Sequence, residues 1–272
     1  KCPACKSKAR RETDVSDTFL DSAWYYLRYP NVGEKKRAWD PDVIQKMFPV
    51  DIYIGGAEHS VLHLLYVRFL ALALHDMKLL QFPKKGGAPA GEPFPVFRAH
   101  GLIIKEGAKM SKSKGNVVNP DEYIKKYGAD TLRMYLMFLA PFEQGGDFRD
   151  QAVSGISRFL ERLSRFIDNS ENTRPEIAAA EKKIIHKTIK KVTEDISSLH
   201  YNTAISALMI CLNGLEELGG AAQETKEAFV KLLAPFAPFM AEELWRGALG
   251  HKNSVHVEAW PQYDERQTQD DK

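Results

Sequence analysis

Near Asp147 the sequence changes character, and this change sets the predicted fold class. On its N-terminal side, short apolar runs alternate with glycine- and proline-rich connections, a pattern typical of strands and loops in an α/β domain. On its C-terminal side, apolar residues recur at helical spacing over long stretches, as in the set Phe159, Leu163, Phe166 and Ile167. We therefore predict an α/β domain followed by an all-α helical bundle.

The length and charge of the chain narrow the classes of protein to consider. A chain of 272 residues can bury a sizeable core and is expected to hold two domains. A net charge of +2 excludes a generally polycationic protein, so any surface for nucleic acid must be local. No window approaches the length of a membrane span and no secretory signal is recognised, so we expect no membrane partner. Three cysteines make no disulfide framework, and we expect a cytoplasmic location.

An apolar run that ends at Ile104 leads into a lysine-rich stretch, residues 109–116, which we call the lysine loop. Its three lysines supply positive charge, its serine hydroxyls and backbone amides supply hydrogen-bond donors, and Gly115 lets the backbone turn close to a ligand. A lysine run is usually a solvated surface. This combination, however, suits a strongly anionic ligand, and a polyphosphate leaving group matches it best.

A second candidate site follows an alternating apolar stretch, residues 50–54, which predicts a strand. Gly55 and Gly56 come directly after it, and an apolar helix is expected over about residues 58–77. A strand, a glycine pair and a helix N-terminus together are the arrangement that places a nucleotide at the carboxyl ends of parallel strands.

Two histidines, His59 and His63, are four residues apart and share one face near the start of this helix. Their spacing could suit a metal, but no third ligand is evident and the order is not that of a His-Glu-x-x-His motif. We interpret them as polar contacts to a nucleotide or an amino acid. Structural packing of one of the two stays open.

Further elements are predicted from local signals. Residues 96–104 predict another central strand that delivers the lysine loop at its end. Asn119, Pro120 and the acids after them predict a helix that stops at Gly128, and a short helix follows over 129–139. Within the bundle, Asn202 is predicted to cap a helix over 202–218, with further helices over 224–234 and 238–249.

The stretch 16–29 mixes aromatic residues with small polar ones, and two interpretations remain open. It could be a helix start capped by Ser16 or Asp17, with its aromatic side chains in the core. It could also line an apolar pocket with a few oriented polar groups, as a small hydrophobic substrate needs. The residues alone favour the first interpretation.

Cys2 and Cys5 have the spacing of one half of a zinc knuckle. Zinc prefers four ligands, and Cys211 lies in an apolar helical pattern typical of a core. Either the other two ligands lie upstream of Lys1, or the pair is a remnant. We therefore predict Zn²⁺ as a half-site only.

Arg158, Arg162 and Arg165 form a basic stripe in the first helical period of the bundle. Such stripes are usually solvated surfaces. In company with the lysine loop they become candidate contacts to a phosphate backbone.

Several of these motifs together resemble the leucyl-tRNA synthetases, most closely those of bacterial type. The spelling Lys-Met-Ser-Lys-Ser in the lysine loop would by itself indicate only a class I aminoacyl-tRNA synthetase. The sequence Asp-Ile-Tyr-Ile-Gly-Gly-x-Glu-His-x-x-x-His over 51–63 narrows the resemblance to the leucine enzymes. The stretches 17–26, 127–131 and 202–205 are also similar.

The resemblance implies a fold and a division of the chain. We predict a zinc-knuckle-like remnant over 1–14, the second half of a Rossmann catalytic domain over 15–115, a stem-contact region over 116–150, an α-helical anticodon-binding domain over 151–250 and a loose tail over 251–272. The implied reaction joins leucine to ATP, giving leucyl-adenylate and pyrophosphate, and then transfers leucine to tRNA-Leu.

The resemblance also implies roles for individual residues. The positions expected around leucine are Phe19, Ser22, Tyr25, Tyr53 and His63. Those expected around ATP are Gly55, Gly56, Glu58, His59, Lys109, Met110, Ser111, Lys112 and Ser113. Lys109 and Lys112 would act catalytically by neutralising the charge of departing pyrophosphate, with Mg²⁺ sharing that work. Arg158, Arg162 and Arg165 would contact tRNA.

The sequence departs from the family pattern in two ways that affect activity. The His-Ile-Gly-His-type motif and an editing domain are absent from it, so we expect the missing N-terminal part of the synthetase to be a partner and the isolated chain to be inactive. Two alternatives stay open. The chain could be a tRNA-binding module without chemistry or a subunit of a split synthetase, or it could belong to the ligase for isoleucine, valine or methionine.

Overall fold

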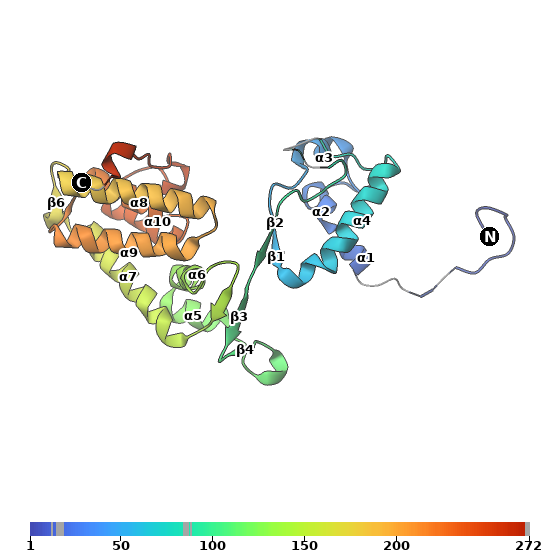
Figure 1. The fold of residues 1–272 in the computed structure, drawn as a ribbon, viewed down its shortest axis with the longest axis horizontal. Coiled ribbons are helices and arrows are strands. Elements are labelled where there is room, and N and C mark those ends of the chain that lie inside the picture. Colours follow the sequence, from blue (N-terminus) through green and yellow to red (C-terminus); the bar gives the residue numbers. More distant parts are fainter. Residues whose placement is uncertain (12, 15–18, 84–86, 88, 270–272) are drawn as a thin grey trace. The chain divides into compact units, whose positions relative to one another are not determined.

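The protein consists of two compact units, Lys1–His100 and Gly101–Lys272, each with its own hydrophobic core (Figure 1). A computed structural model describes residues 1–11, 13–14, 19–83, 87 and 89–269. The predicted helix caps Ser16 and Asp17 lie outside these described residues. The boundary between the two units, His100 to Gly101, falls inside the stretch 96–104, which the sequence pattern predicts to be one strand.

The first unit is a small βαβ arrangement with short helices packed on it. Its elements are α1 (Phe19–Ser22), α2 (Tyr25–Arg28), α3 (Pro41–Met47), β1 (Tyr53–Gly56), α4 (His63–Asp76) and β2 (Phe97–His100). β1 pairs with β2 in parallel, with Tyr53 opposite Phe97 and Gly56 opposite His100. Because α4 connects the two parallel strands, the carboxyl ends of both strands lie at the same edge.

The apolar helix of this unit differs from the prediction at its start. A 3₁₀ turn, Ala57–Ser60, precedes α4, which begins only at His63. The apolar segment Ala57–Asp76 has 20 residues and a mean hydropathy of 1.3, enough by length and composition to cross a membrane. This corrects our prediction that no window approaches that length. Length and composition do not separate such a span from a core helix, and α4 contributes Leu64, Val67 and Ala71 to the core.

The second unit begins with a small sheet and continues as a helical bundle. Its first elements are β3 (Leu102–Lys105), β4 (Ala108–Lys109), α5 (Pro120–Tyr127), α6 (Ala129–Phe138) and β5 (Gly145–Asp147). The bundle comprises α7 (Asp150–Asp168), β6 (Thr173–Arg174), α8 (Ala179–Ser197), α9 (Tyr201–Glu217), β7 (Ala221–Ala222), α10 (Gln223–Leu233) and α11 (Pro238–Glu243). In the bundle, α8 and α9 lie along each other (Figure 1).

The predicted strand over 96–104 is wrong as a single element, because it is divided at Gly101 into β2 and β3. A Cβ atom at Gly101 would overlap the backbone of Gln144 and Gly145. Only glycine at residue 101 therefore allows the chain there to approach the backbone of residues 144 and 145 so closely. Directly after Gly101, β3 pairs in parallel with β5 and antiparallel with β4.

The large core of the second unit lies inside the bundle. Trp245, Phe229 and Phe236 are fully buried within it, and so are Met134 and Tyr135 of α6. Thus α6, in the predicted stem-contact region, shares one core with the helices that follow. This continuity explains why residues after Gly101 form one compact unit.

Local signals predicted some helix ends correctly and others incorrectly. Asn119 caps α5, since its Oδ1 atom accepts a hydrogen bond from the N–H of Asp121 at 3.1 Å. Asn202, by contrast, is not a cap, because α9 begins at Tyr201 and its cap position is His200. The last predicted helix ends at Glu243 and continues only as a π-helical turn.

The C-terminal stretch is held on the bundle, so our prediction of a loose tail is wrong for the residues up to 269. Trp260 donates from Nε1 to the Thr193 hydroxyl at 2.8 Å. The Lys190 ammonium lies 2.8 Å from a carboxylate oxygen of Glu265. Both partners of the tail residues belong to α8, and the contacts cover one side of that helix.

Candidate active site and lysine loop

A cleft of about 480 Å³ opens at the edge of the first unit where β1 and β2 end. It is lined by Ser22, Tyr25, Tyr53, Ile54, Gly55, Gly56, His59, His63 and His100. Residues from α1, α2, β1, the 3₁₀ turn, α4 and β2 therefore converge on one cavity. The carboxyl ends of parallel strands are the usual position for ligands in such sheets.

This cleft brings together most of the residues that we assigned to leucine and ATP. Ser22, Tyr25, Tyr53 and His63 from the leucine set line the same cavity as Gly55, Gly56 and His59 from the ATP set. The side chain of Phe19 lies outside the described part of the structure.

Sequence reasoning missed His100 and Ile54 as lining residues of the cleft. His100 reaches the cleft because it pairs with Gly56 in the parallel ladder. The sequence placed His100 only within a predicted strand. The register of the strand pairing was needed to show that it lies beside Gly56.

A chain of three polar side chains runs along the cleft. The hydroxyls of Tyr25 and Tyr53 are 2.8 Å apart, and the Tyr53 hydroxyl lies 2.8 Å from Nε2 of His63. The Tyr53 ring also stacks on Phe94, with ring centroids 3.9 Å apart. These contacts hold Tyr53 in one orientation, so its hydroxyl is a fixed part of the wall.

Burial changes the acid–base behaviour of this chain. It raises the pKa of Tyr53, and the hydrogen bond between the hydroxyls of Tyr53 and Tyr25 raises it further. It lowers the pKa of His63, and repulsion by His59 lowers it further. His63 is therefore neutral at pH 7, and Tyr53 keeps its proton. The wall is aromatic, hydrogen-bonding and uncharged at these positions, which suits a small molecule with an apolar side chain.

Glu58 lies beside the cleft without lining it. Its carboxylate folds over Gly56 so closely that a Cβ atom at Gly56 would overlap it. At Gly55, a Cβ would meet only His59 and Phe97, both at 3.8 Å. The glycine pair thus leaves the end of β1 without side chains, and a carboxylate stands next to this bare backbone.

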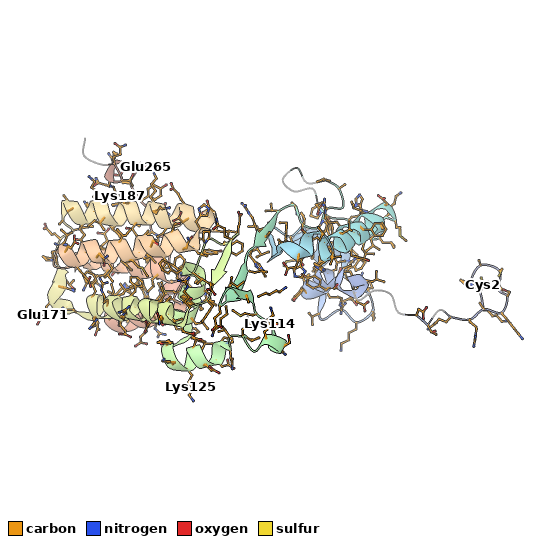
Figure 2. The ribbon with its side chains drawn as sticks, turned by 60° about the horizontal axis from the view of Figure 1, so that its bottom comes forward. Cys2, Lys114, Lys125, Glu171, Lys187 and Glu265 are labelled. Carbon is orange, nitrogen blue, oxygen red and sulfur yellow. The ribbon has the colours of Figure 1, made fainter. Side chains whose placement is uncertain are left out.

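The lysine loop belongs to the second unit and follows the β3–β4 hairpin. Its centre is a 3₁₀ turn, Lys112–Lys114, in which the Ser111 hydroxyl accepts a hydrogen bond from the N–H of Lys114 at 3.3 Å. Gly115 ends the turn with φ +68°, a conformation that favours glycine. Figure 2 shows Lys114 on this loop.

The residues of the lysine loop differ in their exposure. Lys109, Lys112 and Ser113 are exposed, Ser111 is half-buried, and Met110 packs against the core of the unit. Met110, which we assigned to ATP, therefore has an anchoring position. Among the described residues, no carboxylate forms an ion pair with the ammonium group of Lys109 or Lys112. Their positive charge is thus left for an external anion.

The arginine stripe on α7 is less uniform than its spacing suggested. Arg162 is ion-paired with Glu216 and donates a hydrogen bond to Oδ1 of Asn213 at 2.7 Å. Arg158 and Arg165 are exposed, and no carboxylate of a described residue pairs with them. These two therefore present their charge to solvent, whereas Arg162 joins α7 to α9.

The cysteines do not make a zinc site within the described residues. Cys5 lies 3.1 Å from the Ser7 hydroxyl, and hydrogen bonding to Ser7 lowers its pKa to about 7. No group of three or more histidine, cysteine, aspartate or glutamate side chains comes together in the described ranges. Cys2 and Cys5 supply two ligands where zinc needs four, so these residues alone do not fit the metal. Burial raises the pKa of Cys211 to about 12, as expected in a core.

Comparison with known proteins identifies the family. Residues 3–148 match the sequence family described as tRNA synthetases class I (I, L, M and V), and this match covers more than half of the chain. The chain belongs to the class I tRNA synthetases. Residues 183–272 of this synthetase chain match a second family, the anticodon-binding domain of tRNA ligase.

Individual relatives of this synthetase chain carry the name of one ligase. The leucine–tRNA ligase of Dehalococcoides mccartyi is 44% identical over 99% of this chain and 33% of its own length. That of Thermotoga petrophila is 46% identical over 97% of this chain and 34% of its own length. The chain thus spans about a third of the curated relatives that it matches.

A solved structure agrees in fold. The ternary LeuRS–tRNA–LeuAMS complex of Agrobacterium radiobacter K84 contains a chain with a TM-score of 0.84 and 35% identity, and the match covers 99% of this chain and 35% of that one. The predicted order, α/β domain and then helical domain, is confirmed, and so is the resemblance to the leucyl-tRNA synthetases.

Proposed function

We propose that this chain is part of a leucine–tRNA ligase and supplies its leucine pocket, its lysine loop and its anticodon-binding helices. The complete ligase joins leucine to ATP and transfers the leucyl group to tRNA-Leu. The observation that carries the proposal is the cleft at the ends of β1 and β2, which gathers Tyr25, Tyr53 and His63 beside the glycine pair. The names of the relatives support leucine over isoleucine, valine or methionine.

The cleft suits leucine because its wall combines aromatic surface with fixed hydrogen-bonding groups. The apolar side chain of the substrate lies against the aromatic rings, and neutral His63 brings no cation next to it. The hydroxyl of Tyr53, held by Tyr25 and His63, orients the polar end of a ligand. The bare backbone at Gly55 and Gly56 allows close approach by a nucleotide, and Glu58 is suited to accept hydrogen bonds from ribose hydroxyls.

The chemistry needs positioning and charge neutralisation rather than a covalent nucleophile. A carboxylate oxygen of leucine forms a bond to the α-phosphorus of ATP as the bond from that phosphorus to the bridging oxygen breaks, and pyrophosphate leaves. Lys109 and Lys112 stabilise the negative charge that develops on pyrophosphate, and one such contact typically contributes about 3 kcal/mol in the transition state. Mg²⁺, when bound to the phosphates, supplies additional charge neutralisation.

The test is leucine-dependent ATP–pyrophosphate exchange by the full-length ligase that contains this segment. Lys112→Ala is expected to lower kcat about 100-fold or more, with the KM for leucine unchanged, because the contact acts on the leaving group. The control is Lys125→Ala on α5, an exposed lysine outside the loop, which is expected to leave exchange unchanged. Exchange by Lys112→Ala at the wild-type rate would contradict the catalytic role, and clear exchange by the isolated chain would contradict our expectation that it is inactive.

A second candidate function is tRNA binding without chemistry, which the match of residues 183–272 to an anticodon-binding domain favours. In that case the isolated chain would bind tRNA with an affinity that falls steeply with salt, and it would have no measurable affinity for ATP or leucine. Arg158→Ala and Arg165→Ala would then each reduce the salt dependence of tRNA binding, because no carboxylate of a described residue forms an ion pair with either guanidinium group. Leucine binding by the isolated chain would favour the ligase interpretation instead.

A further inference from the structure

We propose that Asn116 is a positioning residue whose side-chain amide clamps the two arms of the lysine loop and thereby determines where the ammonium group of Lys112 lies relative to that of Lys109. The proposal deepens the proposed function and rests on it, because the lysines matter only if pyrophosphate leaves beside them. Asn116 does not itself touch the reacting atoms in this scheme.

The clamp consists of two hydrogen bonds made by one side chain. Oδ1 of Asn116 accepts from the backbone N–H of Ser111 at 2.9 Å. Nδ2 of Asn116 donates to the backbone carbonyl of Lys109 at 3.3 Å. Both partners lie on the incoming arm of the loop, and Asn116 lies on the outgoing arm after Gly115. One amide therefore joins the two arms at their base.

Short-range contacts close the tip of the loop but do not join its arms. The Ser111 hydroxyl accepts from the N–H of Lys114 at 3.3 Å, and Gly115 donates from its N–H to the carbonyl of Lys112 at 3.2 Å. These bonds shape the 3₁₀ turn itself. Only the amide of Asn116 connects that turn back to Lys109, among the hydrogen bonds of the described residues in this loop.

The lysine side chains depend on the backbone for their placement. Lys109 and Lys112 form no ion pair with a described carboxylate that could hold them. Met110, near the start of the loop, and Val118, just after its end, pack against the core. Between Met110 and Val118 the clamp decides the path of the backbone, and with it the position of the Lys112 ammonium group relative to Lys109, which is held in β4.

The first arm of the test measures the loop in the 272-residue chain, without any need for ligase activity. Limited trypsin digestion followed by mass spectrometry reports cleavage after Lys112 and Lys114. Asn116→Ala is expected to accelerate this cleavage about tenfold, because an opened loop is a better protease substrate. Asn116→Asp keeps an acceptor for the Ser111 N–H but loses the donor to Lys109, so an intermediate rate is expected.

The matched control is Asn119→Ala. It removes the same type of side chain three residues further on, where the amide oxygen caps α5 by accepting from Asp121. Cleavage at the loop lysines is expected to stay at the wild-type rate. Cleavage of Asn116→Ala at the wild-type rate would overturn the proposal.

The second arm measures leucine-dependent ATP–pyrophosphate exchange in the full-length ligase. Asn116→Ala is expected to lower kcat about tenfold and to change the KM for leucine less than about twofold, since leucine binds in the other unit. Asn119→Ala is expected to leave both unchanged. If Asn116→Ala opens the loop but kcat stays at the wild-type value, the positioning role is overturned. Because the digestion arm requires no catalysis, failure of the clamp and failure of the proposed function give different results.

Discussion

The two units of this chain each contain an apolar helix, α10 in the helical second unit and α4 in the cleft-bearing first unit, and these two helices are buried to very different extents. In the helical unit, Phe229 of α10 is completely buried, with 0% of its surface exposed. In the cleft-bearing unit, Phe69 of α4 is 70% exposed, and Leu65 next to it is 63% exposed. The α10 helix is therefore enclosed in the core of its unit, whereas α4 leaves much of its apolar surface uncovered.

The largest expected effect tests this contrast with one residue type at two positions. Phe229→Ala is expected to lower the free energy of unfolding by about 3–5 kcal/mol, because it leaves a cavity in a closed core. Phe69→Ala is expected to change it by less than about 0.5 kcal/mol, because most of that side chain is already in water. Urea denaturation of both variants measures the difference. Equal losses at the two positions would show that the contrast between α10 and α4 is false.

A smaller effect is expected from the hydrogen-bond chain of the cleft. Tyr53→Phe keeps the ring that stacks on Phe94 and removes the hydroxyl between Tyr25 and His63. The expected loss is about 1 kcal/mol, the usual net contribution of a hydrogen bond. Urea denaturation compares it with Tyr26→Phe, a control in the core of the same unit. A loss as large as that of Phe229→Ala would contradict the expectation that this hydroxyl contributes no more than a usual hydrogen bond.

The smallest expected effect is a dependence of stability on pH in the cleft-bearing unit. The pKa of His63 is lowered in the folded state, chiefly by burial, so the unfolded state binds its proton more readily. Stability should therefore rise as pH increases towards the unfolded pKa of about 6.5 and be lost as pH falls below it. Denaturation midpoints at several pH values measure this slope, and His63→Gln should flatten it. An unchanged slope would assign the effect to another group.

Local sequence signals predicted those features whose causes are local. Asn119 followed by Pro120 marked the start of α5, because a cap and its helix are adjacent in the chain. The glycine pair and the histidines marked the cleft for the same reason, since β1, the 3₁₀ turn and α4 follow one another directly. Motif spacing was sufficient at these places, whereas the local signal at Asn202 was wrong, because α9 already begins at Tyr201.

Features that depend on packing between distant segments could not be predicted. The need for glycine at residue 101 depends on the backbone of Gln144, more than forty positions along the chain. The sequence spacing places Arg162 on the arginine stripe, but it does not show that Arg162 is ion-paired with Glu216 on another helix and so has its charge partly neutralised. The tail looked loose because the partner of Trp260 is Thr193 on α8, which no local pattern connects to it.

The close approach at Gly101 has a consequence for the gene. Every single-base change at the first or second position of a glycine codon gives either a stop or a residue that carries a Cβ atom. Such an atom at residue 101 would collide with the main chain of Gln144 and Gly145. Only silent third-position changes preserve the close approach of residue 101 to this backbone. Natural variation at codon 101 should therefore be almost entirely synonymous.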